Sequence, residues 1–465
     1  WEYIHIDEYQ DTNEVQSLMS RLLSEKSKNI AVVGDADQNI YSWRGANIKN
    51  ILSFEKDYPD ATIVILEQNY RSTQNIIEAA NEVIKKNKFR TDKNLFTKNE
   101  NGEKISLYEA SDEADEAEYI AGKILEIWDK KENVFGQGLR RAAGPRTEQI
   151  FQQENRDPDH IAFSGLSEIA VLYRANFQSR ALEEAMLRHN IPYQVLGVKF
   201  FERKEIKDTL AYLRAALNPN SLGDIKRIIN FPARGIGKVT LAKIFANDVE
   251  NLPIKVKIKI NNFYQTLEDI KEKIETSKAS EIIKYVVKKS GIEHELSSGS
   301  DEDLERLENI KELATLALKY DNLENGRGVE KLLEDASLAS DQDSIMVNSE
   351  KSKAQTVNAI KLMTVHAAKG LEFKNVFITG LEDGLFPHER RGSNYGQGAN
   401  EDTEEERRLF YVALTRAKEK LFLSFANFRT IFGSRQINAP SEFIFDIPAN
   451  LLEKEEEGRV KTIYI

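Results

Sequence analysis

The 465-residue sequence contains no cysteine. This absence excludes disulfide frameworks, thiolate zinc sites, iron–sulfur clusters and cysteine nucleophiles, and it fits a reducing cytoplasm. The sequence also lacks an apolar run long enough to span a bilayer, and it lacks a signal-peptide pattern. We therefore expect a cytoplasmic protein with no membrane partner.

Basic residues are fewer than acidic ones, 65 against 76, so the formal net charge at pH 7 is −11. By itself this net acidity argues against a nucleic-acid partner, because such proteins usually carry a basic surface. Hydrophobic residues at 40% and charged residues at 30% are typical of a globular protein, and the length suggests two or three domains. The first residue is Trp1 and not Met, which suggests a piece of a longer protein.

Short apolar runs separated by helical patterns predict the buried parallel strands of an α/β fold. The runs occupy residues 3–6, 29–33, 62–66, 168–174, 193–197, 360–366, 376–381 and 420–425. An apolar stripe predicts a helix over residues 112–131. In sheets of this kind, ligands bind beyond the carboxyl ends of the strands, so we expect the site there.

Two stretches differ from this pattern. Residues 200–357 are rich in Lys and Glu and predict an inserted, mostly helical domain, with residues 340–357 as the linker that returns to the α/β domain. Residues 133–167 contain no lysine but several Arg, Gln and Gly residues, which indicates an exposed insertion. That insertion is either a loop without function or an arm that contacts nucleic acid.

The first predicted strand ends in Asp7-Glu8. A strand that ends in two carboxylates can present one of them to Mg²⁺ and use the other to deprotonate the water that attacks a γ-phosphate. Two acidic residues in a turn that starts a helix are the alternative interpretation.

Further polar and aromatic residues follow the next two predicted strands. Residues 34–46 contain Gln38, which can sense a phosphate, and a group suited to stacking on bases and holding a phosphate, Tyr41, Trp43 and Arg44. The aromatic residues are equally consistent with a core. Arg71 follows residues 62–66 and can neutralise charge on a transferred phosphoryl group, or it is a salt-bridge partner.

In this order, residues 4–11, 34–46 and 66–72 resemble motifs II, III and IV of superfamily 1A DNA helicases, the UvrD/PcrA/Rep group. The resemblance continues through motif IVa at residues 170–180, the entry to the group's inserted domain at 201–208, motif V at 362–373 and motif VI at 404–417. It runs along nearly the whole chain. The implied fold is a pair of RecA-like P-loop NTPase lobes, each a parallel sheet flanked by helices, with an inserted helical domain.

The resemblance also implies roles for single residues. Asp7 would hold Mg²⁺ and Glu8 would be the catalytic base. The other residues implied to contact ATP are Gln38 at the γ-phosphate, Tyr70 on the adenine, Arg71 and Arg416 as arginine fingers, and Glu372 near the ribose. The residues implied to contact single-stranded DNA or its junction with a duplex are Tyr41, Trp43, Arg44, Arg174, Asn176, His366 and Phe432.

Residues 232–240, Pro-Ala-Arg-Gly-Ile-Gly-Lys-Val-Thr, resemble the end of a Walker A loop, but Pro232 stands where that loop requires glycine. We interpret them as a turn whose backbone amides meet a duplex phosphate, which agrees with the group's duplex-contacting loop. The residues implied are Gly235, Gly237, Lys238 and Thr240. A plain turn between two helices is the alternative.

The sequence departs from the group in one main respect: no Walker A loop occurs anywhere in it. We therefore predict the end of a first lobe at residues 1–67, a second lobe at 68–199 and 358–450, the inserted domain at 200–357 and a short tail at 451–465. The expected function is that of the C-terminal portion of a monomeric 3′→5′ DNA helicase, inactive as an ATPase by itself. Repair or replication loading proteins are its expected partners.

Two alternatives remain from the sequence. The first is that the chain is a non-catalytic split or degenerate module that binds DNA or protein. The second is that it is a subunit of a helicase–nuclease. The complete set of Asp7, Glu8, Arg71 and Arg416 argues against the first alternative, and the lack of a nuclease domain after motif VI argues against the second.

Overall fold

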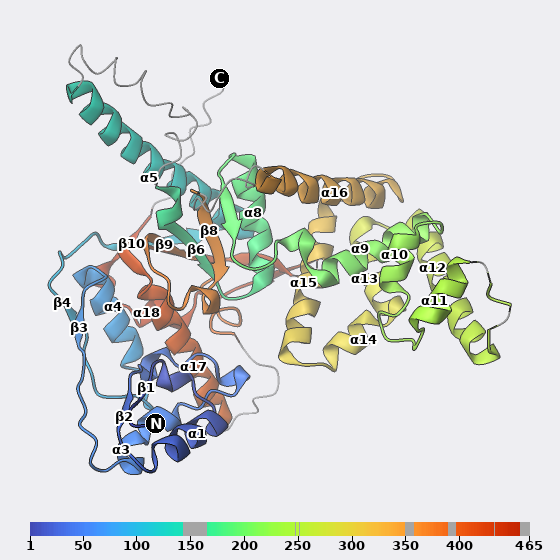
Figure 1. Ribbon diagram of the computed structural model, residues 1–465. Coiled ribbons are helices and arrows are strands. Elements are labelled where there is room, and N and C mark those ends of the chain that lie inside the picture. Colours follow the sequence, from blue (N-terminus) through green and yellow to red (C-terminus); the bar gives the residue numbers. More distant parts are fainter. Residues whose placement is uncertain are drawn as a thin grey trace.

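The computed structural model describes residues 1–142, 165–246, 248–250, 252–348, 358–388, 397–431 and 433–455. Its centre is a seven-stranded sheet in which every pairing is parallel, with helices on both sides (Figure 1). The strand order is β13 (Leu452–Lys454), β5 (Ile105–Ala110), β10 (Ala417–Ala426), β9 (Phe373–Ile378), β6 (Ile169–Tyr173), β8 (Ile360–Thr364) and β7 (Tyr193–Val195). The predicted α/β class is confirmed.

The central strand β6 shows why these residues form strands. All five of its side chains are buried, and they alternate between two cores. Ala170 and Leu172 face helices α4 (Gln74–Ile84) and α17 (Gln397–Leu414). Ile169, Val171 and Tyr173 face helices α5 (Glu113–Ala142) and α8 (Ser179–Arg188). A strand covered on both faces needs a continuous apolar sequence, which is the pattern that identified it.

A smaller α/β part lies beside α17 and contains the first residues of the chain (Figure 1). Strands β1 (Ile4–Ile6) and β2 (Ile30–Val32) pair in parallel, as Ile4 with Ile30. The helices of this part are α1 (Glu14–Ser24), α2 (Lys49–Leu52) and α3 (Phe54–Asp57). The short strands β3 (Gln68–Asn69) and β4 (Phe96–Thr97) pair beyond it.

The strand predicted at residues 62–66 is wrong. Residues 61–67 form no helix or strand, and the side chains of Ile63, Val64, Ile65 and Leu66 are exposed. The sheet in this part has only β1 and β2 among the described residues, so the segment has no neighbouring strand with which to pair its backbone.

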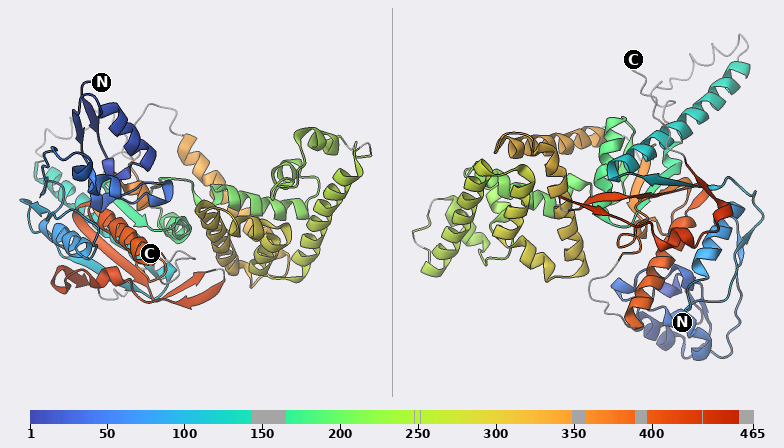
Figure 2. Two further views of the ribbon diagram at one scale, coloured as in Figure 1. Left: turned by 90° about the horizontal axis from the view of Figure 1, so that it is seen from below. Right: turned by 180° about the vertical axis from the view of Figure 1, so that it is seen from behind.

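The inserted domain is helical, and it lies to one side of the sheet in both views of Figure 2. Its apolar side chains form a core of their own. The helices are α9 (Lys204–Leu217), α10 (Leu222–Ile228), α11 (Lys238–Phe245), α12 (Ile254–Thr276), α13 (Ala279–Ser290), α14 (Ile292–Ser297), α15 (Asp301–Ala317) and α16 (Arg327–Asn348). The predicted domain boundaries stay predictions.

Two predicted loops contain helix. Helix α16 continues to Asn348, so the linker predicted at 340–357 is wrong for its first nine residues, and residues 349–357 lie outside the described part. Helix α5 continues to Ala142, so the predicted insertion at 133–167 begins as helix, and residues 143–164 are not described. In both cases a long polar sequence hid the helical continuation, because loop composition and solvated helix composition are alike.

A buried ion cluster fixes the hairpin of β11 (Phe428–Ile431) and β12 (Ser434–Ile437) to the main sheet, close to α18 (Glu442–Phe445). The guanidinium of Arg429 donates to Glu382 at 2.6 Å and to Glu116 at 2.9 Å. Glu382 also accepts from the amide of Asn438 at 2.6 Å. All three charged side chains are nearly inaccessible to water. The far end of the hairpin meets α15, where the N–H of Gly433 donates to Thr315.

Replacing Arg429 with alanine should destabilise the chain by about 3–5 kcal/mol, because two buried carboxylates lose their counter-charge. Thermal or urea unfolding measures the loss. Arg435→Ala on the exposed strand β12 is the matched control and should change stability by less than about 1 kcal/mol. Equal losses for the two variants would show that the ion cluster does not hold the hairpin.

Candidate functional site

The carboxyl end of β1 presents Asp7 and Glu8 to solvent. Glu8 adopts a left-handed backbone conformation, φ 51° and ψ 42°, which costs a residue with a side chain roughly 1–2 kcal/mol. Its N–H donates to the Asp7 carboxylate at 2.9 Å, and its own carboxylate accepts from Gln10 Nε2 at 2.5 Å. The two carboxylates are therefore held in a fixed, strained turn at the edge of the sheet.

Gln10 ties this turn to the end of the second strand. Its buried side chain donates to Glu8 and accepts from the N–H of Asp35 at 2.9 Å. Gly34 has no room for a side chain, because a Cβ there would lie 2.6 Å from Gln10 Oε1. Gln38 then donates to Asp35 at 2.9 Å. The sequence did not single out Gln10, because a buried amide between two strand ends has no sequence signal of its own.

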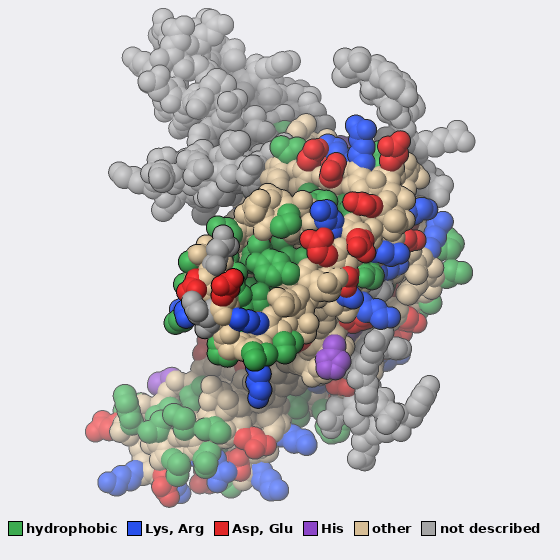
Figure 3. Space-filling model, turned by 90° about the vertical axis from the view of Figure 1, so that its right-hand side faces the viewer, with side chains coloured by type: hydrophobic (Ala, Val, Ile, Leu, Met, Phe, Trp, Pro, Cys, Tyr) green, Lys and Arg blue, Asp and Glu red, His purple; other side chains and the backbone are tan. Residues whose placement is uncertain are grey.

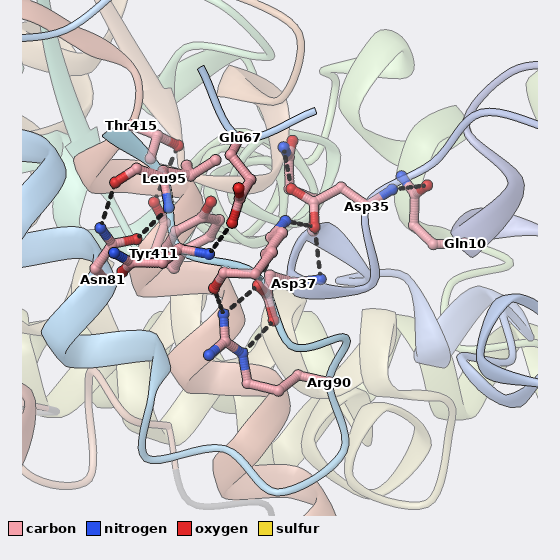
Figure 4. Close-up of polar contacts among 12 residues, drawn as sticks. Gln10, Asp35, Asp37, Glu67, Asn81, Arg90, Leu95, Tyr411 and Thr415 are labelled. Carbon is pink, nitrogen blue, oxygen red and sulfur yellow. Dashed lines mark hydrogen bonds and ion pairs between the residues drawn. The ribbon is translucent and has the colours of Figure 1, made fainter. Parts of the chain in front are cut away.

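The same segment is tied to the loop that follows α4 (Figure 4). Arg90 donates to both oxygens of Asp37, at 3.0 and 3.2 Å, and Lys93 pairs with Asp35. These contacts cross from the first part of the chain to the second lobe. They hold the segment that carries Gln38 against the lobe that carries Arg71.

Arg71 and Arg416, both predicted to contact ATP, lie near each other in the structure. Arg71 donates to Glu372 at 2.6 Å and to the carbonyl of Thr415 at 3.2 Å. Glu372 also pairs with Lys418 at 2.5 Å. Burial and repulsion from the Arg71 guanidinium together lower the pKa of Arg416 to about 10, and burial is the larger cause. Two cations that repel each other in a partly dry site favour an anion between them.

The predicted stacking residues also converge. The rings of Tyr41 and Trp43 lie 6.2 and 6.3 Å from that of His366, and the Arg44 guanidinium lies 4.5 Å from the Trp43 ring centre. The side chain of Trp43 remains 45% exposed. These residues come from two parts of the chain that are more than 300 positions apart, so the structure and not the sequence places them in one cluster.

Lys369 joins the two groups of residues and was not singled out from the sequence. Its ammonium pairs with Asp11, donates to the carbonyl of Gln38 at 2.9 Å and lies 5.0 Å from the centre of the Tyr41 ring. It also lies 3.9 Å from Glu8 Oε2. The side chain is only 8% exposed. One buried cation therefore touches the carboxylate turn, the Gln38 segment and the aromatic cluster.

The comparisons with known proteins agree with this arrangement. A model of the UvrD-like helicase C-terminal domain matches residues 64–137 and 148–428, and a model of the UvrD/REP helicase N-terminal domain matches residues 1–59. The chain belongs to the UvrD-like helicase family. The group identified from the sequence motifs is thereby confirmed.

Named relatives support the assignment. The chain is 42% identical over 484 residues to a protein named ATP-dependent DNA helicase PcrA from Staphylococcus epidermidis, and 41% identical over 483 residues to one of the same name from Staphylococcus aureus. Each match covers 100% of this chain and 60% of the relative. The chain therefore spans about three fifths of the length of these UvrD-like relatives.

The residues present fit a nucleotide phosphate and Mg²⁺, as members of this family would need. Arg71 and Arg416 lie close enough to repel each other, and Tyr70 offers a ring that is 79% exposed. In this structure Arg71 is paired with Glu372, and Arg416 donates to the carbonyls of Val412 and Leu371. No group of three or more metal-ligating side chains occurs in the described part of the chain. Mg²⁺ commonly takes one or two carboxylates and completes its shell with phosphate and water, so Asp7 alone would be a sufficient protein ligand.

Two other residues predicted to contact DNA, Arg174 and Asn176, form hydrogen bonds with carboxylates of the protein. Both oxygens of Glu406 accept from Arg174, and the closest contact is 2.7 Å. Burial acts to raise the pKa of Glu406, but Arg174 holds the pKa below its usual value. Asn176 donates to Glu305 of α15 at 2.6 Å. Their DNA roles stay predictions, and a phosphate would have to displace carboxylates to meet them. Phe432 lies outside the described residues.

The turn predicted at residues 232–240 ends at Gly237, because α11 begins at Lys238 and includes the last three of these residues. Gly235 has φ +67°, a conformation that favours glycine, and Gly237 is the N-cap of the helix. Lys238 is exposed, and Thr240 lies in the first helical turn. A Cβ on Gly235 would lie 3.2 Å from Lys259 Nζ, so a second lysine, from α12, lies over the turn. No helix in the described residues is long and apolar enough to cross a membrane.

Lys369→Ala should destabilise the chain by about 1–3 kcal/mol at neutral pH, because the mostly buried Asp11 loses its charged partner. Burial already raises the pKa of Asp11, and Lys369 opposes that rise, so the pKa climbs further in the variant. A carboxyl group with a raised folded-state pKa stabilises the fold while protonated and loses that contribution as the pH rises. Urea unfolding at several pH values measures the effect.

The variant should therefore lose more stability than the wild type as the pH rises above about 4, the ordinary pKa of an aspartate. The control is Lys369→Ala combined with Asp11→Asn, which removes the titrating group and should remove the extra pH dependence. A single variant whose stability follows the wild type at every pH would show that Lys369 does not compensate Asp11.

Proposed function

We propose that this chain is the C-terminal portion of an ATP-dependent 3′→5′ DNA helicase, a DNA-dependent ATPase that acts on single-stranded DNA and its junctions in repair or replication. Membership of the UvrD-like helicase family supports the class. The observation that carries the proposal is the position of Lys369, which touches both the carboxylate turn and the aromatic cluster. A motor that couples hydrolysis to movement requires an energetic coupling between its nucleotide and DNA sites, and this contact would provide one.

On the nucleotide side, the phosphates of ATP would lie between the Asp7–Glu8 turn and the two arginines. Asp7 would hold Mg²⁺, which would neutralise charge on the phosphate oxygens. The Glu8 carboxylate would orient the attacking water and accept its proton at a carboxylate oxygen. Arg71 and Arg416 would stabilise the charge that develops on the transferred group. The lowered pKa of Arg416 supports this role, since an anion would relieve its repulsion from Arg71.

The remaining nucleotide contacts follow from the exposed groups around the arginines. Tyr70 would stack on the adenine, as its exposed ring allows. Glu372, which holds Arg71 and Lys418, would lie on the ribose side and also fix the direction of Arg71. Gln38, whose side chain is fixed by Asp35, would face the γ-phosphate.

On the DNA side, bases would stack on the partly exposed cluster of Tyr41, Trp43 and His366, with Arg44 on a backbone phosphate. A change at the γ-phosphate reaches this cluster by a short route, because Lys369 holds the carbonyl of Gln38 and lies over the Tyr41 ring. Closing and opening of the lobes would then alternate the grip on the strand.

We further propose that this chain does not hydrolyse ATP by itself. No Walker A loop is present in its sequence to hold the β- and γ-phosphates. Helix α1 also has its apolar side outward: its buried residues are serines, whereas Val15, Leu18, Met19, Leu22 and Leu23 are exposed. An exposed apolar face of this size needs cover by further protein. A Walker A-bearing segment upstream of Trp1 would supply both the cover and the phosphate loop.

The chain alone should show no DNA-stimulated ATPase activity, and a protein extended upstream to the length of its relatives should show it. In the extended protein, Glu8→Gln should lower kcat by at least about 100-fold, because the base is lost while the site keeps its shape. Coupled-enzyme ATPase assays and nucleotide-binding fluorescence measure the two effects.

Binding of a fluorescent ATP analogue should remain within about twofold of the wild type in this variant. Glu2→Gln, an exposed carboxylate at the start of the same segment, is the control and should change neither quantity. An unchanged kcat in Glu8→Gln would refute the assignment of the base, and robust hydrolysis by the chain alone would refute the proposal of an incomplete site.

Trp43→Ala should weaken binding of an oligo-dT strand by about 1–3 kcal/mol, roughly 5- to 150-fold, because a stacking ring is removed. Fluorescence anisotropy of a labelled oligonucleotide measures it. Trp1→Ala is the matched control, since Trp1 is also exposed but lies outside the cluster. Equal affinities of the wild type and Trp43→Ala would argue against the stacking site.

A further inference from the structure

The turn that precedes α11 is held from inside by a small set of polar groups. Asn230 accepts from the N–H groups of Arg234 and Ile236 at 2.9 and 3.2 Å, and donates to the carbonyl of Ile236 at 3.0 Å. The Tyr212 hydroxyl of α9 donates to the carbonyl of Phe231 at 2.5 Å. These bonds define the backbone path from Phe231 to Ile236, on both sides of Gly235.

Arg234 points into the domain and not toward solvent. Its Nη1 donates to the carbonyls of Ile228 and Pro232 at 3.2 and 3.1 Å. Its Nη2 donates to the Tyr212 hydroxyl at 3.0 Å and to the carbonyl of Ser290 at 3.2 Å. The guanidinium carbon also lies 5.4 Å from the centre of the Phe263 ring.

These partners come from four different helices. Tyr212 belongs to α9, Ile228 ends α10, Phe263 lies on α12 and Ser290 ends α13. The carbonyls at the end of a helix have no partners within it and carry partial negative charge, so a cation is favoured there. Only a planar fork with several N–H donors can bond carbonyls in two directions at once, and a lysine ammonium cannot match that geometry.

We infer that Arg234 is a positioning residue for the turn of residues 235–237 and the first turn of α11: its guanidinium binds the ends of α10 and α13 and so holds this segment in place, and it does not contact a DNA phosphate. The inference rests on the proposed contact between this turn and duplex DNA. The inference assigns different roles to two basic residues, Arg234 and Lys238, that are only four positions apart. Arg234 acts through the fold, whereas the exposed Lys238 faces the partner.

Figure 3 faces the end of the helical domain, where hydrophobic side chains gather in the middle and charged side chains surround them. Residues 232–267 carry six basic and two acidic side chains, although the whole chain is acidic. Duplex binding here should therefore depend on salt. Each phosphate that a cation neutralises contributes about 0.9 to the slope of log K against log salt. The slope is proportional to the number of phosphates that the protein neutralises, so removing a positioning residue leaves the slope unchanged.

The experiment measures binding of the full chain to a short, blunt-ended duplex DNA at a series of salt concentrations. Lys238→Ala should lower the slope by about 0.9. Arg234→Gln should weaken binding roughly tenfold at every salt concentration and leave the slope unchanged, because the charge it removes faces carbonyls. Arg234→Lys keeps the charge but loses the fork, so it should not restore affinity.

Two controls separate misplacement of the turn from general loss of structure. Binding of oligo-dT through the Trp43 cluster should be unchanged in the Arg234 variants. Lys273→Ala, also exposed on α12 but 14 residues from Lys259 and thus about 21 Å along the helix, should change neither slope nor affinity. Tyr212→Phe removes one acceptor from Arg234 and should give a smaller loss of affinity, again without a change in slope.

The outcomes are distinct. A slope that falls by about 0.9 in Arg234→Gln, or full rescue by Arg234→Lys, would overturn the inference, because Arg234 would then be a phosphate ligand. Unchanged affinity in both Arg234→Gln and Tyr212→Phe would overturn it as well. If Arg234→Gln does not fold, the Tyr212→Phe result decides. Failure of the wild-type chain to bind the duplex at any salt concentration would instead refute the proposed duplex contact of the turn.

Discussion

One buried ammonium group, that of Lys369, connects the carboxylate turn with the aromatic cluster, the two sites that the proposed function requires to be coupled. It holds Asp11 beside the carboxylate turn, the carbonyl of Gln38 after the second strand and the face of Tyr41 in the aromatic cluster. A cation with so little exposure is stable only where acceptors surround it. The first part of the chain supplies these acceptors and the second lobe supplies the lysine. Together with the Arg90–Asp37 and Lys93–Asp35 pairs, this contact fixes the relative placement of the two parts.

The buried charges explain why net charge says little about the partner of this protein. Glu116 and Glu382 are paired with Arg429 inside the second lobe, and Glu406 is paired with Arg174. Such carboxylates count toward the formal charge of −11 but present no negative field to an incoming ligand. Residues 232–267 carry six basic and two acidic side chains although the chain is acidic. The net acidity of the chain therefore does not argue against a nucleic-acid partner.

The elements that the sequence predicted are those whose burial leaves a one-dimensional pattern. Strand β6 is buried on both faces and reads as an unbroken apolar run. Strand β12 is wholly exposed, so it has no such pattern, and it was missed. Strands β13 and β5 were missed as well, and β5 was missed although four of its six side chains are buried. The run at residues 62–66 has the pattern but lacks a neighbouring strand, which shows that an apolar run indicates burial only if a partner is present.

The candidate site divides in the same way. Motif residues such as Arg71 and Arg416 were found from their sequence context, and the structure brings them together. Gln10, Lys369 and Arg234 act by connecting segments distant in the chain, and the contacts that show their importance exist only after folding.

The central claim is that Lys369 couples the nucleotide and DNA sides, and DNA stimulation of ATP hydrolysis tests it most directly. The measurement compares the upstream-extended protein with its Lys369→Met variant, with and without oligo-dT. The account predicts that the variant keeps its basal ATPase rate and its oligo-dT affinity within about threefold but loses at least about tenfold of the stimulation, equivalent to about 1.4 kcal/mol of coupling. Full stimulation in the variant would contradict the account.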